Sequence, residues 1–123
     1  MRRILIAATA LLMSGGAALA ADDVMAGFYS NTVISTGNGI ESRTHFNADH
    51  TFDAKFSAGG QSLASKGTWS IDAAGQVCRV YDTPPPGITN PVCIPADPHK
   101  VGDHWTVTAG GGTREVTMVA GVQ

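Results

Sequence analysis

Short runs of alternating apolar and polar residues dominate the chain after residue 21, with turn-forming residues between them about every eight to twelve positions. This period of two is typical of half-buried β-strands, because successive side chains of a strand point to opposite faces. Apolar residues at helical spacing are almost absent from the same region. The pattern predicts an all-β protein with strands at residues 27–36, 40–47, 51–57, 63–71, 76–81, 91–94, 104–108 and 113–119.

The order of these runs favours one eight-stranded, antiparallel, up-and-down barrel. Turn residues such as 37–39, 72–75 and 110–112 join neighbouring runs, as they do in hairpins. Closing the sheet into a barrel removes the exposed edges that an open sheet would leave, and an open sandwich is the alternative. The three consecutive prolines at 84–86 place residues 83–90 in a loop. Residues 21–123 have the length of a single domain.

The alternation also predicts which side chains face the interior. In the second, third and fourth runs these are Ile40, Ser42, Thr44, Phe46, Phe52, Ala54, Phe56, Leu63, Gly67, Trp69 and Ile71. On the opposite face, His45 is expected to lie across from Asp53.

The turn between Phe46 and Phe52 predicts one unusual backbone conformation. If these two residues pair across a hairpin, the loop holds residues 48–50. Such three-residue loops usually end on a residue with positive φ, normally glycine. His50 occupies that position, at an expected cost of about 1 kcal/mol relative to glycine.

Residues 1–20 have the three zones of a secretory signal peptide. Arg2 and Arg3 form a positive start, residues 4–13 are apolar, and residues 18–20 read Ala-Leu-Ala before a predicted cleavage site. The apolar run is about half of what a bilayer requires, so we expect no membrane span. The mature protein is therefore predicted to be periplasmic or secreted.

Two cysteines, Cys78 and Cys93, remain after the predicted cleavage. In an exported chain of this size an even number of cysteines indicates a disulfide, worth about 3 kcal/mol for a loop of this length. A two-thiolate metal site is the alternative, but no paired C-x-x-C motif accompanies it.

Charge and motifs argue against several classes of function. The formal net charge is −2, and it becomes −4 once Arg2 and Arg3 are removed, so the chain lacks the basic surface that nucleic-acid binding needs. Asp103 and His104 are adjacent and would face opposite sides of a strand, and no G-x-S-x-G motif supplies a nucleophile. We expect a protein that is not an enzyme.

The four histidines are His45, His50, His99 and His104. Their spacing of five residues within each pair does not match the alternate positions through which one strand face would present two ligands. Isolated surface histidines are the simpler interpretation, and we expect neither a metal nor another cofactor.

A set of aromatic residues is the best candidate for a ligand-binding site. An eight-stranded barrel is just wide enough to hold one small ligand. The rings that would line such a pocket belong to Phe46, Phe52, Phe56, Trp69 and Trp105. The alternative is that these rings simply fill the barrel.

Several short patterns resemble a class of small exported bacterial proteins. They are Phe46-x-x-Asp49-x-Thr51-Phe52, Gly67-x-Trp69, Gly75-x-Val77-Cys78, Cys93 and Val101-Gly102-Asp103-x-Trp105. The proteins of this class are mostly known only as domains of unknown function and are regarded as lipocalin-like, or calycin-like, barrels. The resemblance implies that fold, and it implies a function among binding small apolar ligands, inhibiting hydrolases and roles not yet known.

The sequence as a whole favours a monomeric, non-catalytic binding module. Its ligand would be a small apolar molecule or a component of the cell envelope, including an envelope protein, bound at the barrel mouth. The alternative is a proteinaceous inhibitor of a secreted hydrolase. It would present the loop at residues 83–90 or 95–103, tied down by the disulfide, because preorganised loops lose little entropy on binding.

Overall fold

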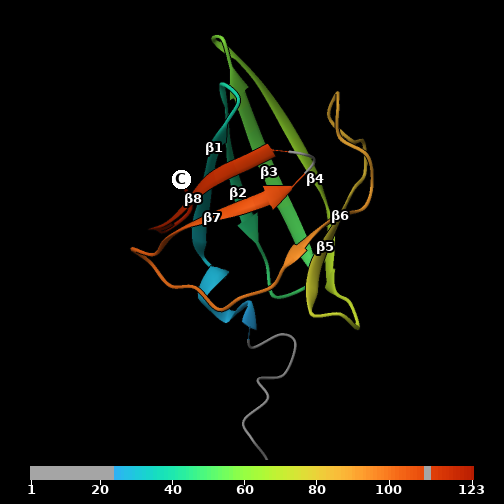
Figure 1. The fold of residues 1–123 in the computed structure, drawn as a ribbon, viewed down its shortest axis with the longest axis vertical. Helices are drawn as coiled ribbons and strands as arrows, with labels where there is room; N and C mark the ends of the chain where they lie inside the picture. Colours follow the sequence, from blue (N-terminus) through green and yellow to red (C-terminus); the bar gives the residue numbers. More distant parts are fainter. Residues whose placement is uncertain (1–23, 110–111) are drawn as a thin grey trace, which may run out of the picture.

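The computed structural model of the protein describes residues 24–109 and 112–123. A short 3-10 helix, η1 (Ala26–Phe28), precedes the strands β1 (Asn31–Gly37), β2 (Ile40–Phe46), β3 (Thr51–Ala58), β4 (Gln61–Ile71), β5 (Gln76–Tyr81), β6 (Val92–Pro95), β7 (His104–Ala109) and β8 (Gly112–Ala120). These eight antiparallel strands form one sheet that curls into a nearly closed barrel (Figure 1). The predicted fold class is confirmed. The predicted signal peptide at 1–20, and residues 110 and 111 of the last turn, lie outside the described residues.

The barrel is interrupted at one place. The strand order is β6-β5-β4-β3-β2-β1-β8-β7, so β8 returns to pair with β1 and leaves β6 and β7 as the two edges. These edges lie beside each other, but within the described part of the chain no ladder of backbone hydrogen bonds joins them. We call this junction the seam.

The first predicted strand begins too early. Residues 27–30 are not extended: the Phe28 amide donates to the carbonyl of Met25 at 2.9 Å, and Ser30 has a φ of 62°. Such a φ interrupts an extended backbone. At Gly27, a Cβ would lie 1.9 Å from the carbonyl oxygen of His99, so this turn packs directly against the segment before β7. The alternating pattern therefore describes β1 only from Asn31 onward.

The alternation predicted for the fourth strand is correct, but its first residue, Leu63, is not buried. Gly67 and Trp69 are buried as predicted, whereas the side chain of Leu63 is 45% exposed. β3 and β4 are long strands, and their hairpin extends beyond the body of the barrel (Figure 1). Leu63 therefore lies on the correct face of β4 but outside the core.

The hydrophobic core lies toward the opposite end of the barrel. There η1 and the segment before β7 cross the barrel opening (Figure 1), and the side chains of Met25 and Phe28, at the two ends of η1, are buried. The buried apolar residues are Met25, Phe28, Val33, Phe46, Phe52, Ala54, Trp69, Val77, Tyr81, Val116 and Met118. We call this end the closed end.

The β2–β3 turn has the predicted geometry. Phe46 pairs with Phe52, the amide of Asn47 donates to the carbonyl of Thr51 at 2.9 Å, and His50 has a φ of 68°. The His50 ring also stacks on Trp69, with 4.1 Å between ring centroids and 13° between planes. His50 therefore combines an unfavourable backbone conformation with a favourable ring contact.

Substitutions at His50 are expected to separate these two contributions. His50→Ala keeps the strained backbone and loses the stack, so we expect it to lower the free energy of unfolding by about 1–2 kcal/mol. His50→Gly loses the stack but relieves the strain, and its change should stay within about 0.5 kcal/mol. Denaturant melts of both variants measure the difference. Equal losses in the two variants would show that the positive φ costs nothing.

The cysteines form the predicted disulfide. Cys78 of β5 and Cys93 of β6 are directly opposite each other in the ladder, with 4.0 Å between their Cα atoms. Their neighbours Val77 and Ile94 face the interior, so the disulfide lies on the outer surface of the barrel.

Candidate functional site

The five aromatic residues predicted to line a pocket do not form one group. Phe46, Phe52 and Trp69 are buried in the core, where the Phe46 ring lies 6.3 Å from each of the other two. Phe56 and Trp105 are partly buried at its margin. Three of the rings thus contribute to filling the closed end, and a role in lining a ligand site stays a prediction for the set.

Two hollows of the structure lie on the surface. One, of about 360 Å³, lies between the tips of the β1–β2 and β3–β4 hairpins and is lined by residues such as Gly39, Ile40 and Ser57. The other, of about 340 Å³, lies beside Asp53, Lys66 and Asp82. Of the five predicted aromatic residues, Phe52 borders the second hollow.

The interior also contains charged residues that the sequence analysis missed. Arg79 lies between Val77 and Tyr81 on the inward face of β5, and Arg114 lies two residues before Val116 on the inward face of β8. We call Arg79 and Arg114 the interior arginine pair. Strand alternation could have revealed both residues, because each shares the parity of buried apolar neighbours.

Arg79 is incompletely satisfied. One Nη1 hydrogen is donated to the hydroxyl of Tyr81 at 3.2 Å. The guanidinium carbon lies 6.0 Å from the centroid of the Phe52 ring and 5.8 Å from that of Tyr81. The Nε atom is buried and has no hydrogen-bond acceptor in the described part of the chain. A buried donor without an acceptor costs about 1–3 kcal/mol, so this arrangement is not optimal for stability.

Arg114 is held differently. Its guanidinium donates to the hydroxyl and carbonyl of Ser35 and to the carbonyls of Gly37 and Ile40. These contacts fix the β1–β2 hairpin to β8. Burial, followed by the nearby charge of Arg79, lowers the pKa of Arg114.

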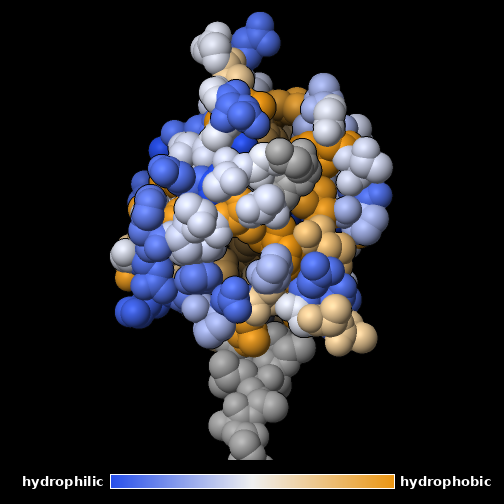
Figure 2. All heavy atoms as spheres, in the orientation of Figure 1, coloured by the Kyte–Doolittle hydropathy of each residue, from blue (hydrophilic) through white to orange (hydrophobic). Residues whose placement is uncertain are grey.

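Polar side chains also face the interior on β1 and β2. Ser42 and Thr44 are buried on the inward face of β2, and Ser35 lies opposite Ser42 on β1. Together with the interior arginine pair, these residues form what we call the polar interior. Near the seam, Figure 2 shows hydrophobic residues between the β7–β8 hairpin and the β4 side of the molecule.

The outer face carries a chain of hydrogen bonds that has the residue types of a hydrolase triad. His45 Nδ1 lies 2.8 Å from Asp53 Oδ2, as the sequence predicted, and His45 Nε2 lies 3.1 Å from the hydroxyl of Thr32. The Thr32 hydroxyl donates its single hydrogen to the carbonyl of Gly121 at 2.7 Å and accepts from the amide of Gln123. Thr32 is also fully buried. The hydroxyl hydrogen is therefore not available to His45, and the buried oxygen lacks the access that a nucleophile needs.

Asp103 and His104, the acid–base pair considered from the sequence, contact different partners. Asp103 contacts His99 at 3.4 Å and Lys100 at 3.3 Å, whereas His104 Nδ1 lies 2.7 Å from the Thr117 hydroxyl. His99 stacks on Trp105, with 3.5 Å between ring centroids. These contacts fasten the segment before β7 to the barrel.

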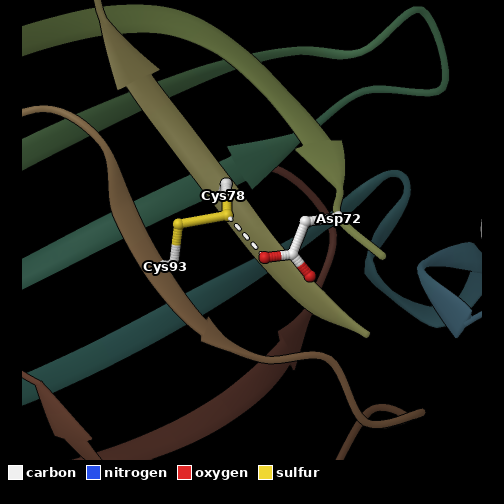
Figure 3. A group of neighbouring side chains, drawn as sticks. All are labelled: Asp72, Cys78 and Cys93. Atoms are coloured by element: carbon white, nitrogen blue, oxygen red, sulfur yellow. Dashed lines mark hydrogen bonds between the residues drawn. A yellow bond between two sulfur atoms is a disulfide. The ribbon is translucent and has the colours of Figure 1, made fainter. Parts of the chain in front are cut away.

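One group of potential metal ligands occurs in the described residues, and it does not include a histidine. Asp72 lies beside the disulfide, with Oδ2 3.6 Å from Cys78 Sγ (Figure 3). The other carboxylate oxygen accepts from the amides of Ala74 and Gln76. Both sulfurs are used in the disulfide, so neither is available as the thiolate that metal binding requires. Through these two amide hydrogen bonds, Asp72 stabilises the β4–β5 turn.

No helix in residues 24–109 or 112–123 is long and apolar enough to cross a bilayer. The chain matches no known family model, no curated protein and no solved structure.

Proposed function

We propose that the protein is an exported, monomeric, non-catalytic module of the lipocalin-like kind, which binds a small molecule in the polar interior of its barrel. The observation that carries the proposal is the contrast between the two parts of the interior. The closed end is packed with apolar side chains, whereas the polar interior holds buried Ser42, Thr44 and the arginine pair.

The inward polar side chains lower the stability of the barrel. Inward Ser, Thr and Arg residues stabilise a barrel less than apolar residues of similar volume would. Choices that lower stability without an evident structural gain concentrate at functional sites. The seam supports the same proposal, because strand edges without a shared ladder can separate at lower cost than a continuous sheet.

Filling the polar interior with a larger apolar side chain tests the proposal. In Ser42→Leu, a larger apolar side chain would occupy the polar interior; Ser62→Leu adds the same bulk at an exposed position of β4. Native mass spectrometry of protein purified without denaturation should show a bound small molecule on the wild type and on Ser62→Leu, but at least about tenfold less on Ser42→Leu. Equal occupancy of all three proteins would place the ligand outside the barrel interior and contradict the proposal.

Inhibition of a secreted hydrolase is a second candidate, supported by the loop between β5 and β6. The side chain of Asn90 makes two 2.8 Å hydrogen bonds to the backbone of Tyr81, and the Ile88 amide donates to the carbonyl of Pro85. Pro84, Pro86 and Gly87 remain exposed. The loop is thus fixed at its base and presents a short exposed tip, as a preorganised inhibitor loop does. Substitution of Gly87 alone should weaken inhibition of the hydrolase without changing the binding of a small molecule inside the barrel.

A further inference from the structure

We propose that Asp72, Cys78 and Cys93 form a metal site that exists only when the Cys78–Cys93 disulfide is reduced, and that its ion is Zn²⁺ or a divalent ion of the same borderline-soft class. The inference concerns the outer surface of the barrel and does not depend on a ligand in the polar interior. It is carried by the convergence of three ligand atoms, by the way in which the Asp72 carboxylate is held and by the access of solvent to the group.

The three side chains converge from three consecutive parts of the sheet. Asp72 directly follows β4, Cys78 lies in β5 and Cys93 lies in β6 (Figure 3). One carboxylate oxygen and the two sulfurs all lie within 4.8 Å of one another. In a tetrahedral zinc site, with Zn–S bonds of about 2.3 Å and Zn–O bonds of about 2.1 Å, sulfur and oxygen ligand atoms lie about 3.6–3.8 Å apart.

The present separations are close to that requirement. Asp72 Oδ2 lies 3.6 Å from Cys78 Sγ. Breaking the disulfide lets the two sulfurs move apart, while the β5–β6 ladder keeps Cys78 and Cys93 opposite each other. The site therefore needs side-chain rotation at the cysteines and no rearrangement of the strands.

The two oxygens of the Asp72 carboxylate have different roles. Oδ1 accepts hydrogen bonds from the amides of Ala74 at 3.0 Å and of Gln76 at 2.8 Å, which fixes the orientation of the carboxylate. Oδ2 is directed at Cys78 Sγ, and a disulfide sulfur has no hydrogen to donate to it. Carboxylates that bind metals are typically held by such hydrogen bonds from an outer shell. Oδ2 is thus oriented in advance as a ligand.

The donor set determines the class of ion. Mg²⁺ and Ca²⁺ take oxygen ligands, whereas two thiolates with one carboxylate suit Zn²⁺. Three protein ligands leave the fourth tetrahedral position to water. Asp72 is exposed and both cysteines are half-buried, so water, the ion and a reductant can reach the group from solvent.

The site forms in two balanced steps. A dithiol reductant gives up two electrons and two protons: its own sulfurs join in a disulfide, the Cys78–Cys93 bond breaks, and each cysteine sulfur takes up one proton. Zn²⁺ then displaces the two thiol protons as two Zn–S bonds form, and Asp72 Oδ2 supplies the third bond from the protein. The ion thereby ties β6 to β5 in place of the disulfide.

Metal titrations of the oxidised and the reduced protein test this inference. The protein is reduced with dithiothreitol, desalted without oxygen and titrated with Co²⁺, whose bonds to thiolates give intense charge-transfer absorption, and then with Zn²⁺ as a competitor. We expect this absorption in the reduced protein, its loss on addition of Zn²⁺, and no such absorption in the oxidised protein. No thiolate absorption in the reduced protein, or the same zinc affinity in both forms, would overturn the inference.

Asp72→Asn tests the third ligand. The amide oxygen of the variant can still accept from Ala74 and Gln76, whereas an NH₂ group replaces the oxygen that faces the sulfurs. The reduced variant should bind Zn²⁺ about tenfold or more weakly than the reduced wild type. Asp82→Asn is the matched control, because it removes an exposed carboxylate outside the group, next to the end of β5; its zinc affinity should equal that of the wild type. Equal affinities of Asp72→Asn and the wild type would contradict the assignment of Asp72.

Thermal melts distinguish a folded site from binding by an unfolded chain. An ion that binds the native state raises its stability, so Zn²⁺ should raise the melting temperature of the reduced wild type, raise that of reduced Asp72→Asn less, and leave that of the oxidised protein unchanged. If reduction alone unfolds the chain, Zn²⁺ should restore the circular-dichroism spectrum of the oxidised protein. Zinc binding that neither raises the melting temperature nor restores that spectrum would refute a site built into the barrel.

Discussion

Replacing Trp69 by alanine should lower the free energy of unfolding by about 3–5 kcal/mol. The side chain of Trp69 is 2% exposed and is the largest of the fully buried side chains in the described residues. Its ring contacts Phe46 and Tyr29, and its indole Nε1 donates to the carbonyl of Asn47 at 3.0 Å. The substitution leaves a cavity at the closed end and removes the donor to Asn47. Both effects act in the same direction.

Urea melts of Trp69→Ala and of Thr68→Ala check this result. Thr68 is the exposed neighbour on the outer face of β4, so its substitution should change the free energy of unfolding by less than about 0.5 kcal/mol. Similar losses in the two variants would mean that both faces of β4 are equally important for stability, which a barrel with one interior does not allow.

Gly67→Ala should cost about 3 kcal/mol or more, although it adds only one methyl group. A Cβ on Gly67 would lie 1.9 Å from the carbonyl oxygen of Val80 and 3.0 Å from Cε1 of Phe52. The first of these atoms belongs to the backbone of β5, which is held in its ladder with β4. The strands would have to separate locally, so hydrogen bonds and core packing would be lost together.

Gly112→Ala is the control for this prediction. Gly112 also lies in a strand, but the nearest atom to its Cβ would be Asn38 Nδ2 at 3.3 Å, at the end of a flexible side chain. We expect a change within about 0.5 kcal/mol in its free energy of unfolding, measured by the same melts. A mild Gly67→Ala variant would show that β5 can shift away from β4 without loss.

Alternation was a reliable guide wherever each strand has one buried and one exposed face. It assigned Phe46, Phe52 and Trp69 to the interior, and the turn rule placed His50 at positive φ, because both depend on local geometry. The disulfide followed from the number of cysteines. The turn and packing residues that carry the family resemblance lie in a barrel of the kind that the resemblance implies.

The errors come from contacts between distant segments. Residues 27–30 alternate like a strand but turn because η1 packs against the segment before β7. Leu63 has inward parity, yet the length of the β3–β4 hairpin carries it beyond the core. Arg79 and Arg114 were overlooked because charge normally marks the outer face of a strand. The parity that they share with buried neighbours nevertheless places both on inward faces, and the register between strands confirms it.

The position of the disulfide has a consequence for how the barrel could open. β6 has only four residues, so its ladder to β5 alone would be a weak attachment, and the Cys78–Cys93 bond supplies a covalent one on the outer surface. Across the seam, β7 is attached to β8 by hydrogen bonds and packing. The two edges are therefore mechanically unequal: outward displacement of the β6 edge is limited by a covalent bond, whereas the β7–β8 hairpin is the side on which widening costs less.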